Sequence, residues 1–446
     1  KKKKIEGDCR LKLKEEALSN IDFNRIQLFG IVEEVEHYTV KSGPLNVSPG
    51  TLVEILSGNQ KVKGIVEKIN SKESFITLFD NYHSIKIGDQ IKILSEGISI
   101  NISDKLIGKV IDPFGKELLA SDKITESIYS TETRNIFSSS INPLKRGDMK
   151  SIFQTGVKTI DGLLTCAEGQ KMGIFAGSGV GKTTLLSMIL KNSQSDIKVI
   201  CLVGERGREV KELLTEHLKN DLTNTIVVVA TSEESSIIRK IAAFSAMTIA
   251  EYFRDKKKKV LLLVDSITRM AIAQREIGIE AGEAPVARGF PPSVFKMLPQ
   301  LLERVGILES GGCITAFFTI LVDGDDTNDP IADQVRGILD GHIILDRNIA
   351  QKNIYPPIDV LSSASRVITN ILNKEELTRI NQVKSWMALI EENKMLQKTG
   401  MYQKGFDNDL DLAFIKEKEI INFLKQDSLS RELYMGTRAL VENLTR

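Results

Sequence analysis

The sequence predicts an α/β protein with a small N-terminal β-barrel, a parallel-sheet core that carries a phosphate-binding loop, and a C-terminal helical domain. Three observations lead to this prediction. Short apolar stretches separated by turn residues fill residues 25–96, as in a small antiparallel barrel. Apolar stretches alternate with helical patterns over residues 151–370, which is typical of a parallel sheet covered on both faces. Residues 371–446 contain few glycines and carry apolar residues at helical spacing.

The N-terminal segment, residues 1–24, is a charged arm in which Leu11, Leu13 and Leu18 stand among lysines and glutamates. We interpret it as a solvated, partly helical segment. Two alternatives stay open: contact of Lys1–Lys4 with acidic lipid head groups, and docking of the leucines onto a partner. The predicted domain boundaries after this arm are 25–96 for the barrel, 97–371 for the core and 372–446 for the helical domain.

The composition is that of an ordinary globular chain, with 41% hydrophobic and 27% charged residues among 446. The formal net charge of +1 argues against a protein that binds nucleic acid through its overall electric field. Four cysteines lie far apart with no Cys-x-x-Cys pair, which favours buried or free thiols in a reducing compartment. The four histidines are also scattered, so a zinc site is not expected.

Five short strands are expected in the barrel. They are residues 26–32, 52–56, 63–69, 75–79 and 90–94, with turn signals rich in Gly, Pro, Ser and Asn between them. Residues 101–120 predict one further strand and a turn that lead into the core. The polar residues 121–150 predict a linker or surface excursion.

Six strands are expected in the core. They are residues 171–175, 197–203, 225–230, 260–264, 313–320 and 342–345, and the clearest helix between them is 233–254. The lysine run 256–259 predicts the solvated end of that helix. Ligands of such sheets bind at the carboxyl ends of the strands.

A glycine-rich loop follows the first core strand and precedes an apolar helical pattern that starts at Leu185. Its glycines let backbone N–H groups turn into one concavity, and the helix N-terminus adds partial positive charge there. We expect Lys182 to reach the outer phosphates and the Thr183 hydroxyl to ligate Mg²⁺. The alternative is an accidental glycine-rich turn. The predicted nucleotide-binding residues of the loop are Ala176 (in place of the usual first glycine), Gly177, Ser178, Gly179, Val180, Gly181, Lys182, Thr183 and Thr184.

Two further strands end in carboxylates. Asp265 ends an apolar strand, where it is expected to hold Mg²⁺ directly or through water. Glu205 follows another strand and is expected to orient and polarise an attacking water. Arg206 is expected to neutralise phosphate charge or to hold Glu205 in place. The alternatives are a turn aspartate at the strand end and a surface salt-bridge cluster.

Residues 355–366 supply two more candidates. Arg366, in a short polar loop, is either a surface charge or an arginine finger that enters a neighbouring subunit's site. Tyr355 either stacks on an adenine ring or is a partly buried tyrosine before a Pro-Pro turn. The spacing alone leaves both questions open.

Several of these motifs together resemble the catalytic subunits of the rotary ATPase superfamily; they are residues 176–183, 204–209, 265–269 and 355–366. Within that superfamily, residues 281–295 and 324–333 resemble the type III protein-export ATPases. Residues 289–295 and 362–367 are most similar to the flagellar branch, and the injectisome branch is the alternative. The resemblance covers nearly the whole chain, from about residue 25 onward.

The resemblance implies a RecA-like core in a cytoplasmic, ring-forming ATPase that uses ATP and Mg²⁺. It implies a homohexamer when active, with a monomer in isolation as the other expected state. The implied role is delivery and unfolding of export substrates at the inner membrane. The implied partners are a stalk-like negative regulator that binds the arm, a central stalk protein, an export gate and chaperone–substrate complexes, with no nucleic acid.

The resemblance also implies residue roles. Lys182 and Thr183 bind phosphate and Mg²⁺, and Asp265 is the second magnesium residue. Glu205 is the catalytic carboxylate, a position that is not acidic in non-catalytic subunits of the superfamily. Arg366 is the finger that acts in trans, and Tyr355 is the adenine-stacking residue. A chain with both Glu205 and Arg366 supplies both sides of one interface, as a ring of identical subunits requires.

Two functions of other classes stay open. One is an RNA-translocating helicase whose barrel binds single strands, and the other is a non-catalytic nucleotide-binding subunit. The near-neutral charge and the 6% aromatic content count against the helicase, and Glu205 counts against the non-catalytic subunit.

Overall fold

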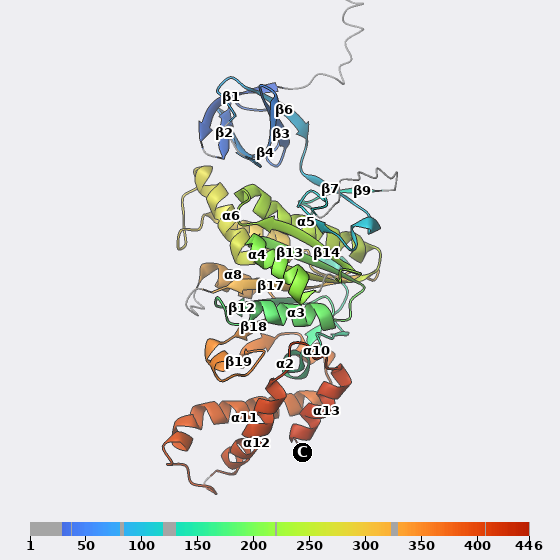
Figure 1. The fold of residues 1–446 in the computed structure, drawn as a ribbon, viewed down its shortest axis with the longest axis vertical. Coiled ribbons are helices and arrows are strands. Elements are labelled where there is room, and N and C mark those ends of the chain that lie inside the picture. Colours follow the sequence, from blue (N-terminus) through green and yellow to red (C-terminus); the bar gives the residue numbers. More distant parts are fainter. Residues whose placement is uncertain are drawn as a thin grey trace, which may run out of the picture. The chain divides into compact units, whose positions relative to one another are not determined.

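The computed structural model describes residues 29–36, 38–80, 84–118, 131–218, 221–322, 329–405 and 407–445. Their contacts divide the chain into two compact units, Lys1–Ile98 and Ser99–Arg446 (Figure 1). The arm at residues 1–24 lies outside the described residues, so the expectations for its lysines and leucines stay predictions.

The first unit contains a closed six-stranded barrel, which confirms the predicted fold of this region. Its strands pair antiparallel in the order β1-β2-β5-β4-β3-β6 and enclose a core that includes Val40, Val53, Ile55 and Ile76, all fully buried. The strands are β1 (Phe29–Glu36), β2 (Thr39–Ser42), β3 (Leu52–Ser57), β4 (Gln60–Ile69), β5 (Ser74–Leu78) and β6 (Gln90–Ser95).

The barrel contains one strand that the sequence did not predict. β2 has only four residues, Thr-Val-Lys-Ser, which is too short for an apolar period to stand out. Its place comes from pairing with both β1 and β5. The described part of the first strand runs on to Glu36, past the predicted end at residue 32, because its pairing with β2 continues to Glu36 and Thr39.

The second unit is built on a nine-stranded sheet with the main order β19-β18-β12-β17-β15-β13-β14-β8. Neighbours in this order are parallel except β18 and β19, and β16 (Gly306–Ile307) pairs with β17 beside the main path. The other strands are β8 (Val110–Ile111), β12 (Lys171–Ala176), β13 (Ile197–Glu205), β14 (Thr225–Thr231), β15 (Lys259–Asp265), β17 (Cys313–Leu321), β18 (Gly341–Leu345) and β19 (Ile358–Ser365).

The central strands of this sheet are apolar almost without interruption. Every residue of β12 is buried, as is every residue of β15 after Lys259, so both faces of the sheet are covered. The predicted parallel core is confirmed. The helices outside the C-terminal domain are α2 (Lys158–Leu163), α3 (Lys182–Asn192), α4 (Gly207–Glu212, continued by a π-turn over Leu213–His217), α5 (Ser236–Asp255), α6 (Ile267–Glu280), α7 (Pro292–Leu302), α8 (Pro330–Ile338), α9 (Arg347–Gln351) and α10 (Ile368–Ile371).

Residues 99–150 contain more regular structure than the sequence predicted. β7 (Ser99–Ile102) pairs with β9 (Glu132–Asn135) in a small separate sheet, while β8 becomes the edge strand of the main sheet. The linker expected at 121–150 therefore includes a strand. The sequence of β9, Glu-Thr-Arg-Asn, has no buried position and hence no apolar alternation to reveal it. Residues 119–130 lie outside the described residues.

Three helices form the C-terminal domain, as the sequence predicted: α11 (Lys374–Lys398), α12 (Asn408–Leu424) and α13 (Tyr434–Thr445). α11 begins at a capping box in which the side chains of Asn373 and Glu376 each accept a backbone N–H of the other residue. Trp386 on this helix is 4% exposed and belongs to the core. In the described part of the chain, no helix is long and apolar enough to cross a membrane.

Candidate active site

The glycine-rich loop lies between β12, which ends at Ala176, and α3, which begins at Lys182. The loop is therefore at the carboxyl edge of the parallel sheet, where the sequence predicted ligand binding. Gly179 and Gly181 have φ angles of 75° and 110°, which residues with a side chain rarely adopt. Gly181 is the N-cap of α3, so the free N–H groups of that helix begin directly at the loop.

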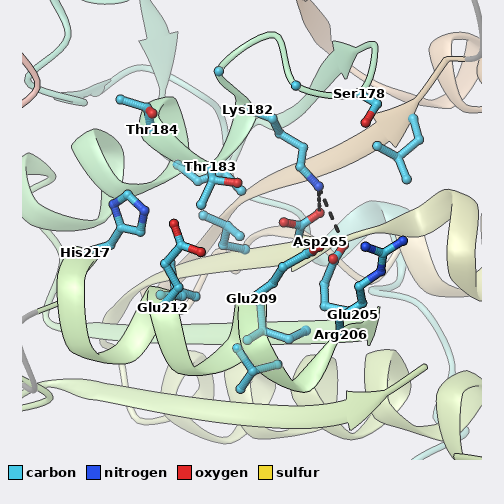
Figure 2. Close-up of a pocket in the computed structure, with 18 of the residues that line it drawn as sticks. Ser178, Lys182, Thr183, Thr184, Glu205, Arg206, Glu209, Glu212, His217 and Asp265 are labelled. Carbon is cyan, nitrogen blue, oxygen red and sulfur yellow. Dashed lines mark hydrogen bonds and ion pairs between the residues drawn. The ribbon is translucent and has the colours of Figure 1, made fainter. Parts of the chain in front are cut away.

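A cavity of about 620 Å³ opens beside the loop. The loop and the first turn of α3 line one side, and the carboxyl ends of β13 and β15 together with α4 line the rest (Figure 2). The predicted residues Lys182, Thr183, Glu205, Arg206 and Asp265 all line this one cavity. The fold thus brings together residues that lie more than 80 positions apart in the chain.

Lys182 is held between the two carboxylates of the cavity. Its Nζ lies 2.5 Å from Oδ1 of Asp265 and 3.7 Å from Oε1 of Glu205 (Figure 2). Thr319 on β17 donates its hydroxyl to the same Oδ1 of Asp265 at 2.7 Å. The three charged side chains are almost fully buried, so Lys182 neutralises part of a carboxylate pair that water screens poorly.

Glu205 has a strongly altered affinity for protons. The pKa of Glu205 is raised to about 8. Burial is the main cause, and the hydrogen bond with Glu209 and the charge of Asp265 also raise this pKa. Lys182 and Arg269 lower the pKa of Glu205, but not enough to offset these effects. The pKa of Glu209 is lowered, chiefly by the same hydrogen bond with Glu205. The two carboxyl groups therefore act as a pair in which Glu205 holds the shared proton.

Arg269 on α6 fixes the end of β13. Its guanidinium donates to the carbonyl of Gly204 and, at 3.3 Å, to Oε2 of Glu205. Gly204 has φ 66°, and a Cβ there would lie 3.1 Å from Cδ of Arg269. The arginine therefore packs directly on this glycine and orients Glu205. Arg206, the other predicted helper, is an exposed residue at the N-cap of α4 that lines the cavity, and its role stays a prediction.

The residues of the cavity fit a magnesium ion. Mg²⁺ prefers oxygen ligands, and it takes one or two from the protein while phosphate and water supply the others. The Thr183 hydroxyl in the first turn of α3 and the Asp265 carboxylate are oxygen donors of this kind. Among the described residues, no group of three or more His, Cys, Asp or Glu side chains is arranged to hold a metal ion.

Tyr355 lies beside a second cavity of about 240 Å³. Met188 of α3, the Pro356–Pro357 turn and residues Gln426–Ser428 line it as well. Tyr355 is 45% exposed, so one face of its ring is available. Thr184 lines both cavities, so a nucleotide with its phosphates on the loop can extend its base toward Tyr355. This arrangement agrees with the predicted stacking role, which stays a prediction.

Arg366 does not join the phosphate cavity of its own chain. Residues 362–365 of the predicted polar loop are in fact the end of β19, which pairs antiparallel with β18, and Arg366 directly follows the strand. The sequence missed this strand because its last residues are mostly serines, whose place comes from pairing with β18. Ser365 pairs with Gly341, at the amino end of β18, whereas the phosphate loop follows the carboxyl end of the neighbouring β12.

The Arg366 side chain is exposed, and its guanidinium donates to the carbonyl of Arg336 on α8 at 3.2 Å. Gly341 pairs with Ser365, whereas Leu345 pairs with Ala176, the last residue before the phosphate loop. Gly341 and Leu345 are four residues apart along β18, which is about 13 Å at the usual rise of a strand. Arg366 is thus held at the edge of the sheet away from its own phosphate loop.

Sequence reasoning did not assign a role to several residues that the fold adds to these cavities. Arg269 stands in the motif that starts at Asp265, but only its contact with Glu205 shows what it does. Glu209 lies in the first turn of α4, four residues after Glu205 at the end of β13. Thr319 and Gln426 come from distant segments, and no local pattern marked them.

Comparisons with known proteins agree with this geometry. Residues 156–365 match the model of the ATP synthase alpha/beta family, nucleotide-binding domain, and residues 372–439 match the T3SS EscN ATPase C-terminal domain. The chain is 42% identical over 428 residues to the flagellum-specific ATP synthase of Helicobacter pylori, covering 96% of this chain and 98% of that one. This chain belongs to the family of flagellum-specific ATP synthases and type III secretion ATPases.

Other members of the family show similar agreement. The flagellum-specific ATP synthase of Bacillus subtilis is 43% identical over 422 residues, with 94% of this chain and 95% of the relative covered. The type 3 secretion system ATPase of Xanthomonas euvesicatoria is 40% identical over 420 residues, with 94% of each chain covered. The structure of the assembled ATPase EscN from the enteropathogenic E. coli type III secretion system superposes with a TM-score of 0.88 at 38% identity, over 94% of this chain and all of EscN.

Membership in the family confirms the resemblance found in the sequence. The chain is an ATP-hydrolysing enzyme that uses ATP and Mg²⁺, with a mixed fold like that of EscN. The comparisons support neither a helicase nor a non-catalytic subunit. The roles of individual residues stay predictions that the geometry supports.

Proposed function

We propose that this protein is the ATPase of a flagellar protein-export apparatus and that it hydrolyses MgATP between identical protomers of a ring. The observation that supports the chemistry most strongly is the meeting of Lys182, Glu205 and Asp265 beside the glycine loop. The flagellar assignment is supported by relatives with 42% and 43% identity, whose names are flagellar, over nearly the whole chain. An injectisome secretion ATPase is the alternative, with a relative at 40% identity.

In the proposed mechanism, the loop N–H groups and Lys182 bind the outer phosphates. Lys182 exchanges its contact with Asp265 for phosphate oxygens when ATP enters. Thr183 and Asp265 would hold Mg²⁺, which would supply positive charge to the bound phosphates. Glu205, aligned by Arg269, orients the attacking water and, in its ionised form, accepts the proton of that water, and Arg206 adds positive charge near the phosphates.

The neighbouring protomer completes the site in this proposal. Arg366 is exposed on the far edge of the sheet from its own phosphate loop, so it is free to enter the site of the next copy. There its planar guanidinium stabilises charge on the transferring phosphoryl group. EscN has been seen in assembled form and in complex with its central stalk EscO. We infer a homohexamer with a central stalk for this chain as well.

The remaining partners follow from the family assignment. A stalk-like negative regulator is proposed to bind the arm at residues 1–24, and hydrolysis is proposed to energise delivery and unfolding of substrates brought by chaperones to an export gate. We propose a cytoplasmic protein that associates peripherally with the inner membrane, where Lys1–Lys4 are positioned in the sequence to contact acidic lipids.

A simple assay tests this function against its alternatives. Steady-state MgATP hydrolysis is measured across a range of protein concentrations, with and without RNA. Specific activity that rises with protein concentration and ignores RNA is expected, because each site needs two protomers. Hydrolysis that depends on RNA would favour a helicase, and no hydrolysis at any concentration would favour a non-catalytic subunit.

A further inference from the structure

Gln426 is a buried residue that joins the C-terminal helices to the nucleotide-binding core. It follows α12, only 7% of it is exposed, and its hydrogen bonds reach two separate segments of the core. Its main-chain N–H donates to the carbonyl of Tyr355 at 2.8 Å. Its side-chain Oε1 accepts the N–H of Lys158 at 2.7 Å, and its Nε2 donates to the carbonyl of Gly156 at 2.8 Å.

One of the two segments that Gln426 joins lines the smaller cavity, and the other packs against the end of α3. Tyr355 lines the smaller cavity beside the phosphate loop. Gly156 packs against the last residue of α3, the helix that carries Lys182, because a Cβ on Gly156 would lie only 2.3 Å from Cβ of Asn192. Asn192 in turn donates to the carbonyl of Ser430 at 3.2 Å, in the same loop as Gln426. The loop between α12 and α13 is therefore hydrogen-bonded both to Tyr355 and to the last residue of α3.

The side-chain amide of Gln426 has no N–H group left to donate to a base. Its oxygen accepts one backbone N–H, and its amide nitrogen donates to Gly156 and, at 3.3 Å, to the carbonyl of Ser430. Gln426 nevertheless lines the cavity together with Asp427 and Ser428, opposite α3 and Tyr355. The groups that Gln426 holds in place are therefore its main route to an effect on a base.

We propose that Gln426 is a positioning residue for the nucleotide base. It holds Tyr355 and the loop at Asp427 and Ser428 at the separation that admits a purine ring. Through Gln426, α12 and α13 contribute to base binding while the phosphate loop binds the triphosphate independently. This inference rests on the proposed role of Tyr355 as the base-stacking residue.

The test compares two ligands that differ only in having a nucleoside. The binding of MgATP and of magnesium tripolyphosphate is measured by calorimetry with the full chain in the Glu205→Gln background, so that ATP is not consumed. The variant Gln426→Met keeps the length and volume of the side chain but removes its hydrogen bonds. We expect it to weaken ATP binding about tenfold, or about 1.4 kcal/mol, and to leave tripolyphosphate binding within about twofold.

Gln170→Met is the matched control. Gln170 is also a fully buried glutamine of the second unit, with its oxygen on the N–H of Ala167 at 2.8 Å and its nitrogen on the carbonyl of Asp340 at 3.0 Å. It does not line either nucleotide cavity, so we expect the same affinity for ATP as in the parent chain. If Gln426→Met does not fold, Gln426→Glu replaces it in the test. This variant keeps the hydrogen bond from the Lys158 N–H, and we expect it to weaken ATP binding as well.

The outcomes separate this inference from the proposed function. An equal loss of ATP and tripolyphosphate binding, or no loss of either, would overturn the role of Gln426. Tyr355→Ala is measured in parallel. If Tyr355→Ala weakens ATP alone while Gln426→Met does not, the stacking role stands and the positioning role falls. If neither variant distinguishes the two ligands, the cavity does not bind the base at all.

Discussion

At the scale of single residues, the site is a compact set of charges whose balance changes when nucleotide binds. Lys182 contacts Asp265 at 2.5 Å, and the pKa of Glu205 is raised to about 8, chiefly by burial, so Glu205 holds a proton below that pH. A triphosphate entering the cavity brings negative charge toward two carboxyl groups. Lys182 and Mg²⁺ are the groups that make this entry favourable, so binding and catalysis use the same residues in different contacts.

The first prediction concerns Glu205. Glu205→Gln keeps the shape and polarity of the side chain but cannot accept a proton from water. We expect MgATP affinity to stay within about threefold and kcat to fall by about 10²–10⁴-fold, the usual effect of losing a general base. Calorimetry and steady-state hydrolysis give the two numbers. Near-normal turnover in this variant would refute the assigned role.

The second prediction concerns the pH dependence set by Glu209. Glu205 works as a base only when ionised, so kcat/KM is expected to rise as pH increases toward its pKa of about 8. The Glu209 carboxylate accepts the proton that Glu205 holds and thereby raises the pKa of Glu205. An amide at this position can donate to ionised Glu205, so Glu209→Gln should lower that pKa and move the rise in kcat/KM to lower pH. A profile that stays in place, measured from pH 5.5 to 9, would show that Glu209 does not control this proton.

At the scale of elements, a buried ion pair links the segment after β9 to the helices α5 and α7. Arg304 is fully buried, and its Nε donates to Oε1 of Glu251 on α5 at 3.0 Å. Its remaining donors reach the carbonyl of Ile136 at 2.6 Å and the hydroxyl of Thr248 at 2.9 Å. One guanidinium therefore links the end of α7, the middle of α5 and the segment that follows β9.

The third prediction follows from this pair. Glu251→Leu leaves the Arg304 guanidinium buried without its counter-charge and is expected to lower the free energy of unfolding by about 3–5 kcal/mol. The change is measured as a shift of the urea midpoint. Glu419→Leu, at the exposed Lys416–Glu419 pair, is the control and is expected to cost less than about 1 kcal/mol. Similar shifts of the urea midpoint in both variants would mean that the buried pair stabilises the fold no more than the exposed pair does.

Sequence patterns predicted those elements that carry their own period or motif. Elements that fall close to their predicted positions are the buried strands β12, β13 and β15, the long helix α5 and the glycine loop. Burial on both faces requires runs of apolar residues, and φ angles above zero favour glycine, so both features can be read locally in the sequence. β2, β9 and β19 were missed. Each is short or polar and takes its conformation from pairing with other strands: β2 with β1 and β5, β9 with β7, and β19 with β18.

The same distinction holds for the site. The charged residues at strand ends were identified because parallel strands bring their carboxyl ends to one edge. Arg269 and Gln426 act through a packed contact with Gly204 and through backbone hydrogen bonds to Gly156 and Lys158. Such contacts exist only in the folded chain, so no spacing in the sequence encodes them.

At the scale of the whole molecule, the central claim is that two identical protomers build one active site. The second unit carries Glu205 at the phosphate loop and Arg366 at the other end of the neighbouring strands. Neither group reaches the other within one chain, whereas a ring of identical subunits can place them together at every interface. An arginine that acts in trans in this way contributes about 10³–10⁵-fold to turnover in comparable enzymes.

The most direct measurement mixes two inactive variants, Glu205→Gln and Arg366→Ala. Each alone is expected to bind ATP and to show almost no assembly-dependent hydrolysis. In an equal mixture, about a quarter of the interfaces join the intact acid of one protomer to the intact arginine of the next, so activity should reappear toward that fraction of the parent level. Activity that stays at the level of the separate variants, although mixed rings form, would contradict the shared site.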